Sequence, residues 1–212
     1  MRLGVEAFTW VGLVVHETFR HNGTVTDRPD QDAYFMGIAL AVRERANCKG
    51  QRVGAVLVQD NRVISTGYNG TAEKMTNCED GGCYRCAHRE QFKSGMGYDL
   101  CICVHAEQNA LISAGRFGAS AEGGVLYSTT RPCFGCTKEL SQAKVHAVYF
   151  IHDWKHPDEQ VAAEYSKLQA RIPGGMNQMK DFSDPRAEWA LNQPVDAQDT
   201  GHSIPGNEGD PI

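Results

Sequence analysis

Residues 105–136 have the sequence HAEQNALISAGRFGASAEGGVLYSTTRPCFGC. Apolar and small residues recur at helical spacing over 105–116, GVLYSTT (124–130) favours a β-strand, and a second helix is expected over 133–143. Helices that alternate with strands predict an α/β layer architecture in which helices pack on a small sheet. This stretch therefore decides the fold class.

The cysteines that open the second helix indicate a metal site. Cys133 and Cys136 are three residues apart, so their thiols project to the same side of a helix start, where Pro132 is tolerated and the helix dipole favours thiolates. With His105 they make three protein ligands for zinc and leave a fourth position for water, which is the catalytic arrangement. Zinc lowers the pKa of bound water from about 15.7 to about 7.

Glu107 is predicted to move protons at this site. Residues i and i+2 do not share a helix face, so His105 and Glu107 converge only if His105 lies at a loop-to-helix junction and Glu107 in the first turn. A carboxylate there can take a proton from water and return it to the leaving group. H-x-E followed by P-C-x-x-C is the signature of zinc deaminases, with the glutamate as general acid and base. The alternative is a structural zinc site with Glu107 as a solvated cap.

The flanking chain continues the alternation. Asp30 or Asp32 can cap a helix that reaches Ala46, and Asp60-Asn61 form the turn of an expected hairpin. Further elements are expected as strands over 53–58, 62–68 and 145–151 and as a helix over 157–171.

The chain is expected to have three parts. An N-terminal extension covers 1–29, a deaminase domain covers 30–172, and a largely irregular tail covers 173–212. Within the domain, residues 69–104 show no sustained periodicity, so a long cysteine-rich loop or insertion is expected there.

Composition limits the function classes. A formal charge of −5 and a pI near 5.9 give no basic footprint for long nucleic acids. Residues 1–15 lack the charge pattern and cleavage site of a signal peptide and are too short to span a bilayer. We therefore expect a cytoplasmic protein without a membrane partner, in which eight cysteines more often bind metal than form disulfides.

From Asp30 to Ile151 the sequence resembles the deoxycytidylate (dCMP) deaminase family of the cytidine deaminase-like superfamily, most closely its bacterial, competence-associated members. The motifs that carry the resemblance are YFMGIA, VGAVLV, ISTGYNG, HAEQNAL, RPCFGC and AVYF. ISTGYNG followed by a cysteine-bearing insertion is the most specific of them. The resemblance implies an α/β/α sandwich around a mixed sheet of about five strands, although no fifth strand is evident after residue 171.

The resemblance also implies substrate-binding residues. Asn69 is expected to contact the sugar and Arg116 the substrate phosphate; the alternatives are a turn-forming Asn-Gly pair and a solvated arginine near a helix end. Three positions depart from the family pattern, because Thr137 and Lys144 replace small residues and Arg131 adds a charge at the lip of the pocket. They leave a triphosphate, a modified nucleotide or a non-nucleotide amine open as substrates.

Six cysteines remain outside the predicted catalytic site. The resemblance implies a second, structural zinc ion held by four of them: Cys48, Cys78, Cys83 and Cys101. Four thiolates would close a tetrahedral site and anchor the insertion. Cys86 and His88 are rival ligands, Cys103 is a candidate buried free thiol, and unliganded cysteines are the alternative. His152 and His156 are interpreted as part of a polar surface turn.

The sequence thus predicts hydrolytic deamination of dCMP to dUMP and ammonia. The alternatives are a deaminase of the same fold that acts on another nucleotide, nucleobase or small amine, and a non-catalytic zinc-binding interaction protein. The resemblance further implies dCTP and dTTP as effectors and a homo-oligomer.

Overall fold

The computed structural model describes residues 20–21, 24–25, 28–92 and 96–189. The chain divides into two units, Met1–Asp30 and Gln31–Ile212. In the first, β1 (Arg20–His21) pairs antiparallel with β2 (Thr24–Val25). The predictions for residues 1–15 and for the end of the tail lie outside the described residues.

The second unit is built on a five-stranded sheet in the order β4-β3-β7-β8-β9. β3 (Gly54–Gln59) pairs antiparallel with β4 (Arg62–Tyr68) and with β7 (Val125–Thr130). The pairs of β7 with β8 (Ala147–His152) and of β8 with β9 (Met176–Gln178) are parallel. This mixed sheet of five strands confirms the predicted fold class.

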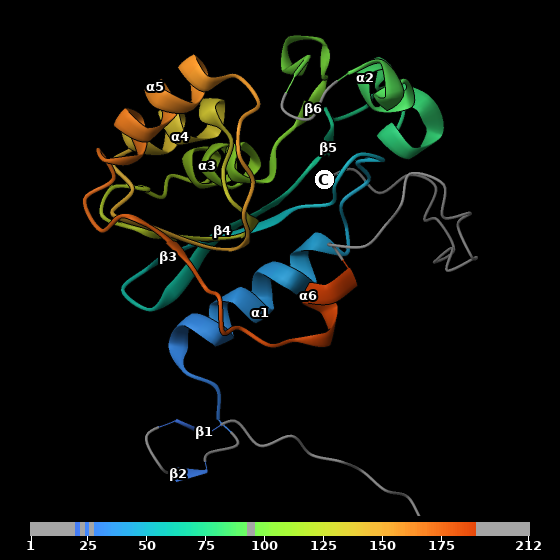
Figure 1. Ribbon diagram of the computed structural model, residues 1–212. Helices are drawn as coiled ribbons and strands as arrows, with labels where there is room; N and C mark the ends of the chain where they lie inside the picture. Colours follow the sequence, from blue (N-terminus) through green and yellow to red (C-terminus); the bar gives the residue numbers. More distant parts are fainter. Residues whose placement is uncertain (1–19, 22–23, 26–27, 93–95, 190–212) are drawn as a thin grey trace, which may run out of the picture. The chain divides into compact units, whose positions relative to one another are not determined.

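Helices cover both faces of the sheet (Figure 1). α1 (Gln31–Arg43) and α6 (Pro185–Trp189) lie on one side, and α3 (Ala106–Arg116), α4 (Phe134–Gln142) and α5 (Glu159–Gln169) lie on the other. The three-layer sandwich is therefore confirmed. None of the helices in the described part of the chain is long and apolar enough to cross a membrane.

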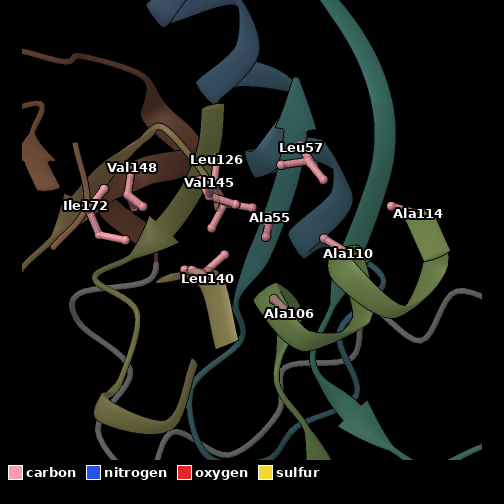
Figure 2. Close-up of a cluster of buried hydrophobic side chains, with 10 residues drawn as sticks. All are labelled: Ala55, Leu57, Ala106, Ala110, Ala114, Leu126, Leu140, Val145, Val148 and Ile172. Atoms are coloured by element: carbon pink, nitrogen blue, oxygen red, sulfur yellow. The ribbon is translucent and has the colours of Figure 1, made fainter. Parts of the chain in front are cut away.

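Two hydrophobic cores lie on the two sides of the sheet, and β3 contributes side chains to both. Ala55 and Leu57 join the core beneath α3 and α4, which Figure 2 shows, whereas Val56 and Val58 join the core beneath α1. Successive side chains of a strand point to opposite faces, so a run of apolar residues suits a strand that is buried on both sides. This accounts for the unbroken sequence VGAVLV.

The hairpin of β3 and β4 turns at the predicted residues. Asp60 and Asn61 have φ angles of 49° and 59°, the left-handed conformation that two-residue hairpin turns require and that these residue types tolerate. The prediction of this hairpin is confirmed.

The cysteine-rich insertion 69–104 contains short regular elements. Its described residues form β5 (Gly70–Thr71), η1 (Cys78–Gly82), α2 (Tyr84–Ala87), η2 (Arg89–Gln91), η3 (Tyr98–Leu100) and β6 (Cys103–Val104). β5 pairs with β6, so the two ends of the insertion are fastened together. Elements of two to five residues carry no sustained periodicity, which is why the sequence pattern does not reveal them.

The fifth strand comes from the segment that the sequence predicts as a tail. β9 lies beyond residue 172 and hydrogen-bonds to β8, and Ala187 of α6 packs in the core beneath α1. A strand of three residues is too short to give a recognisable alternation. The sheet and its cover therefore extend past the domain end predicted at residue 172.

Gly67 of β4 allows α3 to approach the sheet closely. A Cβ atom at this position would lie 2.1 Å from the carbonyl oxygen of Ala106 and 2.4 Å from the backbone nitrogen of Ala110. Both atoms belong to the first turn of α3, so only glycine permits this packing. Gly67, the first glycine of ISTGYNG, thus lets the start of α3 pack directly against β4.

We predict that Gly67→Ala lowers the melting temperature, because α3 must move away from β4 to make room for the methyl group. Overpacking of this kind costs about 1–3 kcal/mol, which corresponds to roughly 3–10 °C, and is measured by thermal unfolding. Gly115→Ala is the matched control, since a Cβ atom there meets nothing within 4 Å. Equal melting temperatures for the two variants would contradict the prediction.

Candidate metal centre and active site

His105, Cys133 and Cys136 come together although the first two are 28 positions apart in the sequence. The Nδ1 atom of His105 lies 3.4 Å from the Sγ atom of Cys133 and 3.3 Å from that of Cys136. Tetrahedral zinc with bonds of about 2.0–2.1 Å to nitrogen and about 2.3 Å to sulfur needs a nitrogen–sulfur separation of about 3.6 Å. The three side chains therefore fit a zinc ion closely.

His105 lies at the junction that the sequence predicts. It precedes α3 in an extended conformation (φ −74°, ψ 157°), and its carbonyl oxygen accepts a hydrogen bond of 2.9 Å from the backbone N–H of Asn109. Its own N–H donates to the Oε1 atom of Gln108 at 2.9 Å. Glu107 is consequently in the first turn of α3, next to the metal ligands.

Cys133 likewise lies at a loop-to-helix junction, directly before α4. It is extended (φ −70°, ψ 173°), and its Sγ atom accepts from the backbone N–H of Cys136 at 3.5 Å. Hydrogen bonds with Cys136 and His105 outweigh burial and hold the pKa of the Cys133 thiol at about 4. The buried Thr137 donates its hydroxyl to the carbonyl oxygen of Cys133 at 2.9 Å, so this departure from the family pattern supports a ligand.

Burial and neighbouring charges shift the pKa values of Glu107 and His105. Burial raises the pKa of Glu107, which is 4% exposed, to about 7. Burial lowers the pKa of His105, but its hydrogen bond with Cys133 and the charges of Cys133 and Glu107 outweigh that effect and raise the pKa to about 9. A carboxyl group with a pKa near 7 can both accept and return a proton at neutral pH.

Three hydrogen bonds clamp α3 in place. The amide of Asn109 donates to the carbonyl oxygen of Tyr68 at 2.7 Å, and the hydroxyl of Ser65 donates to that of Ala110 at 2.8 Å. Gln108 donates to Glu139 of α4 at 2.9 Å. The two helices that carry the metal ligands are thus tied to β4 and to each other.

Tyr98 was missed by the sequence reasoning. Its ring and the imidazole of His105 form a T-shaped contact with centroids 5.4 Å apart. The guanidinium of Arg85 lies over the Tyr98 ring, 4.7 Å from its centre. Burial raises the pKa of Tyr98, as do the charges of Cys133, Cys101 and Cys136. The sequence offers three aromatic residues within the insertion, Tyr84, Phe92 and Tyr98, and nothing in their spacing singles out Tyr98.

Asn69 is buried and holds the chain that leads into β3. Its Oδ1 atom accepts from the N–H of Val53 at 2.7 Å, and its Nδ2 atom donates to the carbonyl oxygen of Gln51 at 2.7 Å. These bonds give Asn69 a structural role in the GYNG motif. Contact with the sugar stays a prediction.

Arg116 lies far from the metal ligands within one chain. It is the last residue of α3 and is exposed, whereas His105 precedes the first residue. A helix of 11 residues is about 16 Å long. Contact of Arg116 with the phosphate stays a prediction, and the geometry of a single chain does not support it.

The two other positions that depart from the family pattern, Arg131 and Lys144, interact with neighbouring side chains. Arg131 forms an ion pair of 2.7 Å with Asp153 and lies over the ring of Tyr165. Lys144 occupies a turn with φ of 57° and pairs with Glu122 at 2.9 Å. Neither side chain needs a substrate to explain its position.

The six other cysteines also gather, but not as predicted. One group of possible ligands contains Cys48, Cys78, Cys86 and Cys103, and another contains Cys83, Cys86, Cys101 and Cys103. The predicted set of Cys48, Cys78, Cys83 and Cys101 is therefore not a single group. Cys103 is a buried free thiol, as considered, and belongs to both groups.

The histidines considered as ligands lie elsewhere. His88 stacks on Tyr84 and makes a hydrogen bond of 2.9 Å to its carbonyl oxygen. His152 is buried at the end of β8, whereas His156 lies in the following turn and bonds to Asp158.

Comparison with known proteins finds a matching protein family and several relatives of similar sequence. The family model described as the cytidine and deoxycytidylate deaminase zinc-binding region matches residues 29–152. The deoxycytidylate deaminase of Schizosaccharomyces pombe is 45% identical over 143 residues, which are 68% of this chain and 42% of that protein. ComE operon protein 2 of Bacillus subtilis is 35% identical over 136 residues, which are 63% of this chain and 66% of that protein. The chain thus spans less than half the length of the fission-yeast relative.

A solved structure shares the fold. The dCMP deaminase of cyanophage S-TIM5, in complex with dCMP and dUMP, has a TM-score of 0.54 and 26% identity. The match covers 72% of this chain and 98% of that one.

We predict that zinc binding at His105, Cys133 and Cys136 weakens as the pH falls from 9 to 6. Zinc needs neutral histidine and thiolates, so below the His105 pKa of about 9 binding must release at least one proton. The apparent affinity should then fall about tenfold for each pH unit and proton released. Metal-stripped protein is titrated with buffered zinc at each pH, and Cys136→Ser is titrated in parallel to subtract the other cysteines. The prediction would be contradicted if the difference in zinc binding between wild type and Cys136→Ser did not change with pH.

Proposed function

Because the chain belongs to the cytidine and deoxycytidylate deaminase family, we propose that it is a zinc-dependent hydrolase that converts dCMP and water into dUMP and ammonia. The observation that carries the proposal is the buried Glu107 beside the convergent ligands His105, Cys133 and Cys136. Three protein ligands with an adjacent carboxylate make a catalytic rather than a structural zinc site.

The choice of dCMP rests on the relatives. The fission-yeast protein is a deoxycytidylate deaminase, and the cyanophage enzyme of the same fold was solved with dCMP and dUMP. The chain also has the GYNG motif, in which the buried Asn69 bonds to the segment that leads into β3. An acidic chain with a pI near 5.9 suits a small nucleotide better than a long polynucleotide.

His105, Cys133 and Cys136 would hold the zinc ion. When bound, zinc makes hydroxide available near neutral pH by lowering the pKa of water. The backbone N–H of Cys136 and the hydroxyl of Thr137 keep Cys133 in position, and Gln108 fixes the backbone of His105.

Glu107 carries the protons. It accepts one from the attacking water and protonates ring N3 while oxygen bonds to C4 of the pyrimidine. A further proton then passes through Glu107 to the amino group, the C4–N bond breaks, and ammonia leaves. The pKa of Glu107, raised by burial to about 7, suits both directions of transfer.

Tyr98 and Arg85 form one wall of the substrate site. Tyr98 is in T-shaped contact with the imidazole of His105 and about two-fifths exposed, so part of its ring is accessible to a planar base. Arg85 lies over the ring and brings a positive charge towards an anionic nucleotide.

The assembly and its regulation are also proposed from the family resemblance. Ile112 and Phe117 are 53% and 82% exposed on either side of Arg116, and such an apolar surface suits contact with a second copy in a homo-oligomer. Arg116 would then reach a phosphate across that contact. We propose dCTP and dTTP as effectors, and the cytoplasm as the compartment, since all eight cysteines are free thiols.

We predict that Glu107→Gln abolishes dCMP turnover but keeps zinc. The amide fills the same space but cannot accept a proton, so kcat should fall by at least 10²–10⁴-fold. Ammonia release and zinc content are measured on one sample. Glu164→Gln is the control, because Glu164 pairs with Lys167 on the exposed face of α5 and should leave the rate unchanged. Wild-type turnover in the Glu107 variant would refute the role of this residue.

If neither dCMP nor a panel of CMP, dCTP, cytidine and adenine compounds releases ammonia from the zinc-loaded wild type, the protein is a binding module rather than a deaminase.

We predict that Tyr98→Leu raises the KM for dCMP about 2–10-fold, because a face for the base worth about 0.5–1.5 kcal/mol is lost. Tyr98→Phe should restore the wild-type KM if the ring itself makes the contact. Tyr84→Leu is the control, since Tyr84 lies in the same insertion but stacks on His88. An unchanged KM in Tyr98→Leu would remove this residue from the pocket wall.

A further inference from the structure

Cys48 and the five cysteines of the insertion form a cluster separate from the proposed active site. Five of the six are buried and Cys101 is half-buried. They contact one another as a hydrophobic cluster made only of cysteines: Cys48, Cys78, Cys83, Cys86, Cys101 and Cys103. They come from three parts of the chain, namely the loop after α1, the segment from η1 to α2, and the segment that leads into β6.

The sulfur separations are those of a metal–thiolate site. The Sγ atoms of Cys48 and Cys86 are 3.9 Å apart, and those of Cys83 and Cys101 are 3.8 Å apart. Tetrahedral zinc with Zn–S bonds of about 2.3 Å places its sulfur ligands about 3.8 Å from one another. A disulfide needs about 2.05 Å between the sulfurs, and all six thiols are free.

The cluster contains two overlapping sets of four ligands. Cys48 and Cys78 belong to one set, Cys83 and Cys101 belong to the other, and Cys86 and Cys103 belong to both, with all sulfurs of a set within 4.8 Å of one another. Two separate four-thiolate sites would need eight cysteines, but only six of the chain's eight are available here. Both sets can be filled together only if two thiolates are shared.

We propose that the insertion holds two zinc ions in a binuclear thiolate cluster, with Cys86 and Cys103 bridging the metals. Cys48 and Cys78 complete the tetrahedron of the first ion, and Cys83 and Cys101 complete that of the second. Each zinc ion then has four sulfur ligands, which is the closed arrangement of structural sites. The protein would carry three zinc ions in all.

The backbone around the cluster is shaped for sulfur. A Cβ atom on Gly50 would lie 3.3 Å from the Sγ atom of Cys48 and 3.7 Å from that of Cys86, so glycine lets the chain pass close to both. The N–H of Lys49 donates to the Sγ atom of Cys78 at 3.3 Å. Six thiolates and two Zn²⁺ ions have a net charge of −2, and Arg89, which donates to the carbonyl oxygen of Gly50 at 2.9 Å, brings a positive charge to this loop.

The cluster also reaches the proposed active site through the chain. Cys103 lies in β6, two residues before His105, and Cys101 directly follows the η3 turn that carries Tyr98. A bridging Cys103 would thus fix the approach to a ligand of the catalytic zinc. Among the described residues of the insertion, the buried apolar cluster consists of cysteines alone. Metal binding would therefore supply its folding free energy.

The test is the zinc content of the purified full chain, measured by mass spectrometry of the metal against protein determined by amino-acid analysis. We expect three zinc ions per wild-type chain and two in Cys136→Ser, which loses only the catalytic ion. Cys86→Ser and Cys103→Ser should each lose up to two ions, because each removes a ligand from both. Two zinc ions in the wild type would overturn the proposal.

A second measurement does not depend on variants that fold poorly. Wild-type protein loaded with ¹¹³Cd should give two resonances from four-thiolate sites, each split by coupling to the other metal through the shared sulfurs. Unsplit resonances, or one resonance, would overturn the bridging arrangement. The result is independent of the proposed reaction, because a protein with three metal ions and no ammonia release would retain the cluster and lose only the deaminase function.

Discussion

The close contact between β4 at Gly67 and the first turn of α3 sets the position of the whole site. Without a side chain on Gly67, the backbone of α3 lies against the strand, and Asn109 and Ser65 then fasten the two together. Because His105 immediately precedes this turn, a shift of α3 would move it relative to Cys133 and Cys136 on α4. The chemistry of the site thus depends on the packing of one helix on one strand.

Metal binding has a different physical role in the two cysteine-containing regions. At the proposed active site, three ligands extend from helix starts that a packed sheet already holds in place, so zinc adds reactivity to a preformed scaffold. In the insertion, five cysteines together with Cys48 from the loop after α1 occupy the place of a hydrophobic core. There zinc would determine whether the segment folds at all, and that segment places Tyr98 against His105.

Burial gives the site its acid–base character. Glu107 is buried in the first turn of α3, and removal from water raises its pKa towards neutrality. The thiol of Cys133 moves in the other direction, because hydrogen bonds from its neighbours stabilise the thiolate. One small region therefore holds a carboxyl group that exchanges protons near neutral pH beside a thiol that readily binds metal.

The sequence by itself determined the α/β class, the hairpin at Asp60-Asn61, and the junction that brings Glu107 to the side of His105. Each of these follows from residues close together in the chain, where periodicity and turn chemistry fix the geometry. Only the tertiary structure decided the rest. It paired β9 with β8, divided the cysteines into two overlapping sets, placed Tyr98 against His105, and left Arg116 at the far end of α3. Such contacts join segments far apart in sequence, and local spacing carries no information about which segments meet when the sheet and the insertion pack.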